Sequence, residues 1–567
     1  MLRNVLKYKL HLLVIMIVLF VQVFFAFEKE GYHMDELISY EMANAEYNPW
    51  IVPTQPVGRL AKFMHKEIDA PSFAGTVSNL YNTVKDVVVN RGGSKILSYK
   101  ADVYEEPVWI SKEQFVDYLT TDKNDDFNYI SVVFNVKDDN HPPVHFMLLH
   151  TMSSVFSGSM SSMLGLIINI IMLVGSMLIL MKLGLFLEKE KVFPKNFGYC
   201  FGIVSSLMYG CSHAAIATSL LIRMYGVLTF LCLSTFYLHL KKWYKEEYAA
   251  NNKLLIVVTI LGFWTQYFFL FYCLTLSLLT MLMLLYKKRK SETIIYIRSM
   301  VLAAIIGVLG YPFAIEDVFR SGRGVEAIEN LKGGLGAYCE RIVQFGSIAI
   351  SRCFGNVSIG LGILVIILTV TVVLFVNKKN YRSLLLFFYL PAIGYFFAAA
   401  KMSPMYVDRY IMALFPFMVS WLAIFLCVLL QKNKGIKYST IVLLIGYCVF
   451  HILTYDGTYL YKGYERQIQI SKEYGDLSCV CLYEGYGFYE NVIEFTNYER
   501  TLLVKPQELL ERRDTESVEN QEKMIFLVKE FIPEESFNLI LQKYGFNVVE
   551  VLVDRGPHGD RVFLCGK

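Results

Sequence analysis

The sequence predicts an α-helical polytopic membrane protein with about eleven transmembrane helices and a small C-terminal extracytoplasmic α/β domain. Its 567 residues have a mean hydropathy of +0.42 and only 18% charged side chains, which is too apolar for a soluble protein of this size. Apolar runs of about 20 residues recur along the chain. Lys and Arg cluster in every second loop between these runs, as the positive-inside rule requires of membrane helices.

The first apolar run, 10–27, follows the basic residues Arg3, Lys7 and Lys9. This start is similar to a signal peptide, but no small-residue cleavage site follows Phe27, so we expect a retained helix. The further helices are expected at 161–182, 197–218, 222–240, 253–267, 269–286, 297–315, 355–376, 383–400, 409–430 and 437–455.

The basic clusters place the N-terminus in the cytoplasm and the C-terminus outside, in a multi-pass protein of the cell membrane. The predicted membrane domain is 1–455 and includes a large, acidic external loop at 28–160. Residues 456–567 form a separate α/β domain, with strands expected at 478–484, 501–504, 524–529, 547–553 and 561–565 and a helix at 533–544. The Gly-rich region 316–345 is a further external loop, and its part 321–336 is either a mobile lid or a flexible connector.

The acidic pair Asp35-Glu36 lies shortly after the first helix. A charge held beside the hydrocarbon is costly and usually functional. Further along, His141-Pro142-Pro143 precedes apolar residues at helical spacing, which predicts an interfacial helix over 142–157. A similar pattern follows the acidic pair at 37–46. Two interfacial helices would bracket a pocket at the outer leaflet.

These features together resemble the GT-C glycosyltransferases, in the branch of the protein mannosyltransferases and the lipid A aminoarabinose transferases. The resemblance covers residues 10 to about 430 and rests on short motifs in the same order and on the same membrane side. The motifs are Asp35-Glu36, His141-Pro-Pro-Val-His145 with His150, Arg223-Met-Tyr225, Gln266-Tyr267 and Tyr406-Val-Asp-Arg409-Tyr410 followed by Leu414-Phe-Pro416.

The resemblance implies an inverting transfer of a sugar from a polyprenyl-phosphate donor to an extracytoplasmic lipid, surface glycan or protein. Asp35 would be the catalytic base, with Glu36 as a second catalytic candidate. The implied substrate-binding residues are His141, His145, Arg223, Tyr225, Gln266, Tyr267, Lys401, Arg409 and Tyr410. The partners would be the lipid-linked sugar, the bilayer and the acceptor; no cofactor and no nucleic acid are expected.

The chemistry of the residues agrees with this assignment. A carboxylate can take the proton of an attacking hydroxyl, and the planar fork of arginine suits a departing phosphate. One departure from the family is that Ser212–Ile222, the short second external loop, contains no acid. Many relatives carry a second acid there, so a two-carboxylate mechanism and a two-acid metal site are in doubt.

Several plainer interpretations stay open. Asp35-Glu36 are also typical of a helix N-terminus. His141 and His145 could bind a divalent metal with Asp35, although no third ligand is evident beyond these. Arg223 and Arg409 could extend toward lipid headgroups, and Asp408 could simply pair with Arg409. A flippase for lipid-linked sugars or a non-catalytic membrane scaffold are the alternative functions. A transporter is expected to carry polar residues at mid-membrane, which several of the predicted helices lack.

Overall fold

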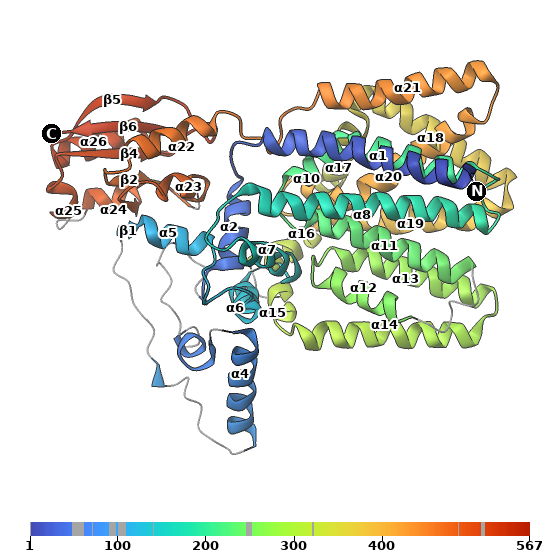
Figure 1. The fold of residues 1–567 in the computed structure, drawn as a ribbon, viewed down its shortest axis with the longest axis horizontal. Coiled ribbons are helices and arrows are strands. Elements are labelled where there is room, and N and C mark those ends of the chain that lie inside the picture. Colours follow the sequence, from blue (N-terminus) through green and yellow to red (C-terminus); the bar gives the residue numbers. More distant parts are fainter. Residues whose placement is uncertain are drawn as a thin grey trace. The chain divides into compact units, whose positions relative to one another are not determined.

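The computed structural model describes residues 2–47, 51, 62–70, 72–89, 98–99, 109–139, 141–244, 252–319, 322–485, 487–511 and 516–567. The chain forms two compact units (Figure 1). We call residues 1–27, 137–145 and 166–458 the helical unit, and residues 28–136, 146–165 and 459–567 the mixed unit.

The helical unit confirms the predicted positions of the apolar helices, since each of the predicted segments contains one. Its elements are α1 (Leu2–Phe27), α8 (Ser162–Lys189), α9 (Phe197–Cys211), α10 (His213–Leu220), α11 (Tyr225–Tyr244), α12 (Lys253–Phe263), α13 (Phe269–Tyr286), α14 (Lys290–Gly310), α15 (Ala314–Phe319), α16 (Gly322–Lys332), α17 (Leu335–Phe354), α18 (Val357–Asn377), α19 (Lys379–Met402), η5 (Asp408–Leu414), α20 (Phe415–Leu430) and α21 (Lys434–Leu453). The first four residues of α8 belong to the mixed unit.

The number of helices able to cross a membrane is smaller than the predicted eleven. In the described part of the chain eight helices are long and apolar enough, or nine if α9 and α10 form one span. These two helices are bent by 60° at Ser212, whose hydroxyl accepts from the Ala215 N–H and so starts a new helix. Helix α12 has only 11 residues. Helix α11 has 20 residues but is not apolar enough to count as a span. These two helices and the bend between α9 and α10 account for the difference between the two counts.

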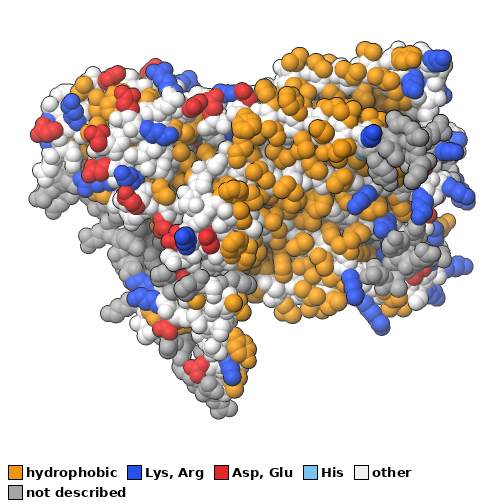
Figure 2. All heavy atoms as spheres, viewed as in Figure 1, with side chains coloured by type: hydrophobic (Ala, Val, Ile, Leu, Met, Phe, Trp, Pro, Cys, Tyr) orange, Lys and Arg blue, Asp and Glu red, His pale blue; other side chains and the backbone are white. Residues whose placement is uncertain are grey.

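The outer surface of the helical unit is apolar, as lipid contact requires. Figure 2 shows a broad hydrophobic band on this unit, with Lys and Arg gathered at the end where the N-terminus lies. Only 11% of the most apolar window of α18 is buried, and Val365, Val372 and Val376 on it are exposed. These side chains are stable in hydrocarbon but would be unfavourable in water.

The predicted Gly-rich loop is wrong for most of its length, because α15, α16 and the start of α17 occupy it. The reason is the position of the glycines. Gly322 and Gly324 lie in the first turn of α16, and Gly333-Gly334 separate α16 from α17, so the sequence between them, Val325–Lys332, is free to form a helix. The two residues before Gly322 lie outside the described residues.

The mixed unit combines the first external loop with the C-terminal segment. Its elements are α2 (Met34–Asn44), η1 (Met64–Ile68), α4 (Phe73–Val88), β1 (Trp109–Ser111), α5 (Lys112–Leu119), α6 (Tyr129–Asn135), α7 (Val144–Val155), α22 (Tyr464–Glu473), β2 (Cys479–Leu482), η6 (Gly487–Asn491), α23 (Val492–Phe495), β3 (Arg500–Val504), α24 (Pro506–Glu511), α25 (Glu516–Glu519), β4 (Lys523–Val528), α26 (Glu534–Tyr544), β5 (Asn547–Val553) and β6 (Arg561–Gly566). A turn of 3-10 helix, η3 (Val136–Asp138), follows α6, and the first two residues of α7 belong to the helical unit.

One sheet organises this unit, in the order β1-β3-β2-β4-β6-β5. Strands β3, β2 and β4 are parallel, and β1, β6 and β5 are antiparallel to their neighbours. Alternate residues of the parallel strands, such as Val480, Leu502 and Phe526, join Phe537 and Ile540 of α26 in one buried cluster. The small C-terminal sheet region and the five predicted strands are confirmed.

Strand β1 was not predicted, and it changes the domain description. It comes from the first external loop, and it pairs with β3 at Trp109↔Leu502, Ile110↔Thr501 and Ser111↔Arg500. Most of the loop 28–160, predicted as part of a membrane domain 1–455, therefore belongs to the same compact unit as the C-terminal segment. The third stretch of that unit begins at Tyr459, close to the predicted boundary of 456. A three-residue strand is too short to be evident without its partner.

Candidate functional site

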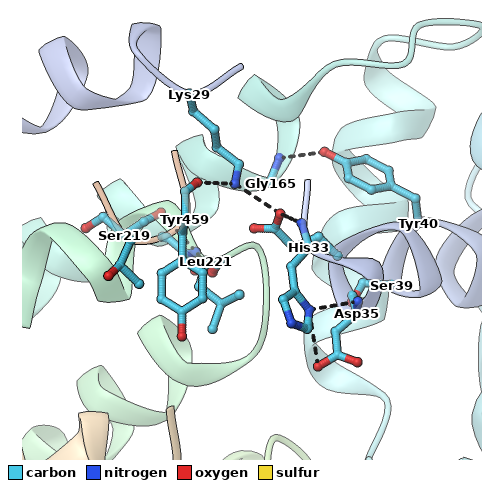
Figure 3. Close-up of polar contacts among 12 residues, drawn as sticks. Lys29, His33, Asp35, Ser39, Tyr40, Gly165, Ser219, Leu221 and Tyr459 are labelled. Carbon is cyan, nitrogen blue, oxygen red and sulfur yellow. Dashed lines mark hydrogen bonds and ion pairs between the residues drawn. The ribbon is translucent and has the colours of Figure 1, made fainter. Parts of the chain in front are cut away.

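Asp35 lies in the first turn of α2, which a capping box starts. The imidazole Nδ1 of His33 accepts from the Asp35 N–H at 3.0 Å, and it lies 3.6 Å from the Asp35 carboxylate (Figure 3). The Ser39 hydroxyl donates to the Asp35 carbonyl at 2.7 Å. The Asp35 side chain is 18% exposed. A partly exposed carboxylate on a fixed helical turn is suited to proton transfer.

Glu36 has different surroundings, although it is the next residue. Its side chain is fully buried and accepts from the ammonium of Lys29 at 3.0 Å. The same carboxylate oxygen accepts from the backbone N–H of His33 at 2.7 Å, which completes the capping box. Glu36 therefore holds the start of α2. The two adjacent acids, which the sequence presents as one pair, have distinct environments.

In the helical unit, His141 links Asp139 to Arg223. The His141 Nδ1 lies 3.0 Å from an Asp139 carboxylate oxygen, and the Arg223 Nη2 lies 3.3 Å from the His141 Nε2. The same Arg223 Nη2 lies 3.3 Å from the His141 Nδ1 as well, so the guanidinium faces both nitrogens of the ring. Asp139 and His141 together orient the guanidinium of Arg223, whose residue is 4% exposed.

His145, at the start of α7, is completely buried near the same arginine. Burial lowers the pKa of His145 to about 3, with the charge of Arg223 as the next cause. The ring is therefore neutral at physiological pH. His145 consequently adds no positive charge beside Arg223.

The position of Arg223 is fixed by the turn between α10 and α11. The side-chain amide of Asn169 on α8 donates to the carbonyls of Ser219, at 3.2 Å, and Leu221, at 2.6 Å; Figure 3 labels both acceptor residues. The Arg223 N–H donates to the Leu221 carbonyl at 2.8 Å. Tyr225 then begins α11 and is buried. Sequence reasoning missed Asn169, because an amide within an apolar helix carries no motif.

The turn between α12 and α13 lies beside the His141 segment. The Val144 N–H donates to the Trp264 carbonyl at 3.0 Å. Gln266 is buried, and its side-chain oxygen accepts from the Phe268 N–H at 3.1 Å. The Tyr267 hydroxyl donates to Asp317 of α15 at 2.5 Å.

Asp317 is a buried acid of this neighbourhood that the sequence did not single out. The hydroxyl of Tyr311 lies 3.4 Å from the carboxylate oxygen that accepts from Tyr267. Asp317 lies in the region that the sequence predicts to be a Gly-rich loop, and no sequence motif there indicates that its side chain is held in place. Asp317 is therefore a buried carboxylate of the helical unit. It does not come from the second external loop, Ser212–Ile222, which contains no acid.

The other predicted binding residues are at helix ends. Lys401, near the end of α19, donates to the Gly333 carbonyl at 2.8 Å. Arg409 lies in η5, with its guanidinium 5.6 Å from the Tyr410 ring centre. The Tyr410 ring is 5.9 Å from that of Phe268, which connects it to the Gln266-Tyr267 turn.

Asp408 forms an ion pair with Arg352 at 2.8 Å. The sequence had suggested Arg409, its neighbour, as the partner. Arg352 also contacts Asp456 at 3.0 Å and donates to the Thr458 hydroxyl at 2.9 Å. An arginine 56 residues from Asp408 in the chain is not accessible to reasoning from spacing.

Within the helical unit, the structure therefore brings together His141, His145, Arg223, Gln266, Tyr267 and Tyr410 through the contacts above, and it adds Asp139 and Asp317. Lys401 contacts the turn between α16 and α17 instead. Within the mixed unit, the partly exposed Asp35 and the fully buried Glu36 have different surroundings. Among the described residues, no group of three His, Cys, Asp or Glu side chains is placed to hold a metal ion.

Comparison with known proteins gave few matches. No protein-family model and no curated protein sequence matches the chain. Among solved structures, it is similar to the crystal structure of ArnT from Cupriavidus metallidurans bound to undecaprenyl phosphate. That match has 11% sequence identity and a TM-score of 0.44, and it covers 75% of this chain and 88% of that chain. The apo ArnT structure matches with 10% identity and a TM-score of 0.42, covering 75% and 87%. At this level of similarity, the function has to be argued from the side chains themselves.

Proposed function

We propose that the protein is an integral membrane glycosyltransferase of the GT-C type, which transfers a sugar from a polyprenyl-phosphate donor to an extracytoplasmic hydroxyl acceptor. The proposal is supported by the ordered motifs of the sequence and by two groups of side chains. One is the carboxylate of Asp35 with His33, and the other is the cation of Arg223 with His141 and Asp139.

The proposed reaction is a single inverting displacement. The acceptor oxygen attacks the anomeric carbon and forms the new C–O bond, while the bond from that carbon to the phosphate oxygen breaks. The bonding electrons leave with the polyprenyl phosphate, and Asp35 takes the acceptor proton. Arg223 stabilises the charge that develops on the departing phosphate, through its planar donors.

The observation that carries the proposal is the difference between Asp35 and Glu36. Glu36 is fully buried and bonded to Lys29 and to the His33 N–H, whereas Asp35 is partly exposed. A general base must come within hydrogen-bond reach of the proton it takes. Asp35 satisfies this condition better than its neighbour.

The test is transfer of label from radiolabelled undecaprenyl-phosphate-linked sugars, with membranes containing the full-length protein. Asp35→Asn keeps the shape of the side chain and removes its basicity. We expect transfer to fall by roughly 10²–10⁴-fold, which is the usual contribution of a general base, while expression and donor binding are retained. Asp117→Asn, which changes an exposed acid of the same loop, is the matched control and should keep normal activity. A fully active Asp35→Asn protein would exclude the catalytic role and favour a flippase or a scaffold.

A further inference from the structure

A buried ion pair joins the segment before α2 to its first turn. The Lys29 ammonium lies 3.0 Å from the Glu36 carboxylate, and neither side chain is exposed to solvent. Lys29 also donates to the backbone carbonyl of Tyr459 at 2.7 Å, as Figure 3 shows. All these residues belong to the mixed unit. One ammonium therefore binds both the helix that carries Asp35 and the start of the C-terminal segment.

Further contacts hold residues 28–33 against residues 459–464. The Glu30 N–H donates to the Leu460 carbonyl at 2.8 Å. A Cβ on Gly31 would lie 2.8 Å from the Tyr461 Cβ, so this approach is open only to glycine. The Lys29 ammonium lies 5.1 Å from the Tyr461 ring centre. The two segments are thus closely packed along their length.

Such a pair has a cost that a purely stabilising contact would avoid. Removing two charges from water is unfavourable, and apolar replacements of a buried pair are often equally stable. Burial lowers the pKa of Lys29, against the opposing effect of Glu36. A buried ion pair with several fixed partners holds the groups that it joins in a single arrangement. Here one of those groups is the turn that includes Asp35.

We infer that Lys29 and Glu36 are positioning residues, which hold the first turn of α2 against the segment 459–464 and so fix the direction of the Asp35 carboxylate. This inference rests on the proposed function of Asp35. The C-terminal segment would then contribute to catalysis by holding the helix that carries Asp35, although none of its residues touches the substrate. A displacement of about 1 Å can reduce a rate by about 10²-fold, so a base on a loose helix end would be inefficient.

The test compares two buried glutamates of the same helix. Glu36→Gln leaves the ammonium of Lys29 without a counter-charge. Glu41→Gln is the matched control, because Glu41 is equally buried, but it accepts from the Ile51 N–H at 2.6 Å and lies near the Tyr489 hydroxyl. Its contacts are at the other end of α2. Thermal stability, hydrogen exchange over 33–40, kcat and the donor KM are measured for both full-length variants with the undecaprenyl-phosphate sugar that the wild type uses.

We expect Glu36→Gln to lower kcat by about 10- to 100-fold, with the donor KM nearly unchanged and faster exchange over 33–40. Glu41→Gln should keep kcat close to the wild-type value, because burial raises the pKa of Glu41 well above its usual range and the amide resembles the protonated acid. Equal kcat values in the two variants would overturn the inference.

If Glu36→Gln does not fold, the double variant Lys29→Met with Glu36→Gln provides the same test, because no buried charge remains and the amide can still accept from the His33 N–H. It should fold with a kcat below that of the wild type, and a folded double variant with wild-type kcat would equally overturn the inference. The Asp35→Asn result separates the two ideas. An active Asp35→Asn protein refutes the proposed base, whereas the exchange data still report whether the pair holds α2.

Discussion

At the scale of single residues, the direction of the Arg223 guanidinium is set by its neighbours. The Arg223 Nη2 lies 3.3 Å from both ring nitrogens of His141, and the His141 Nδ1 lies 3.0 Å from an Asp139 carboxylate oxygen. The arrangement therefore supplies one positive charge in a fixed direction, which suits a phosphate oxygen better than a mobile surface arginine does.

Arg223→Ala is predicted to weaken donor binding, by roughly 2–4 kcal/mol, as expected for removing one partner of a buried charged interaction. Arg223→Lys should recover only part of this loss, because lysine cannot bind two oxygens with a planar fork. The measurement is the Kd of a radiolabelled undecaprenyl-phosphate sugar in detergent. Arg298→Ala, at a helical position outside the cluster, is the control. Unchanged donor affinity in Arg223→Ala would leave this arginine with a structural role only.

At the scale of elements, helix α8 supports the turn that presents Arg223. Asn169 is buried, and its amide donates to two carbonyls at the end of α10. Asn169→Leu leaves both carbonyls without this donor, at a cost of about 1–3 kcal/mol for each buried group. We predict a higher donor KM together with faster hydrogen exchange over 219–225, measured in the full-length protein. Asn169→Leu with normal exchange there would contradict the supporting role of α8.

Helix α23 contains a second element-scale feature, the buried acid Glu494. Burial, followed by the charge of Asp560, raises the pKa of Glu494 to about 8. Asn491 donates to both acids, at 2.6 and 2.8 Å. In the unfolded chain a glutamate titrates near pH 4.3. The folded state therefore keeps a proton that the unfolded state loses between about pH 4.3 and 8.

The raised pKa of Glu494 therefore adds to the free energy of unfolding. This contribution is complete below about pH 4.3 and is lost as the pH rises through about 8. Hydrogen exchange over 491–495 should consequently accelerate from pH 5 to pH 8.5, after correction for the intrinsic rate. Glu494→Gln, which mimics the protonated acid, should remove much of this dependence. A variant with the same pH dependence as the wild type would assign the effect to other groups.

At the scale of the whole molecule, the pairing of β1 with β3 restricts the membrane topology. Residues 109–111 and 500–504 share one sheet, so they lie on the same side of any membrane. The chain must then cross an even number of times between them. Of the eight described candidate spans, seven follow α1, and the bent α9–α10 pair adds one more. The count is even if this pair crosses as one span and α11 and α12 either both cross or both stay on one side.

Single-cysteine accessibility in whole cells is the measurement for this prediction, in a background where the exposed native Cys339 is replaced. Cysteines at Lys123 and Glu535, in the first loop and in α26, should react with an impermeant thiol reagent. A cysteine at Lys288 should react only after the cells are opened, because the positive-inside rule predicts that the basic loops face the cytoplasm. Opposite labelling of Lys123 and Glu535 would be incompatible with the shared sheet.

Local sequence pattern is sufficient to predict the helices, the strands and the motif residues. Apolar period and length predict the helices of the helical unit, and alternation predicts the five C-terminal strands, because hydrophobicity acts on neighbouring residues. The motif residues Asp35, His141 and Arg223 also follow from short-range pattern. The different surroundings of these residues depend on tertiary packing, as the structure shows. It buried Glu36 with Lys29, connected Asp139 to Arg223, paired Asp408 with Arg352 and joined β1 to β3. Each of these contacts joins elements or segments whose meeting is set by packing and by the cost of burying a charge without a partner, which no local pattern expresses.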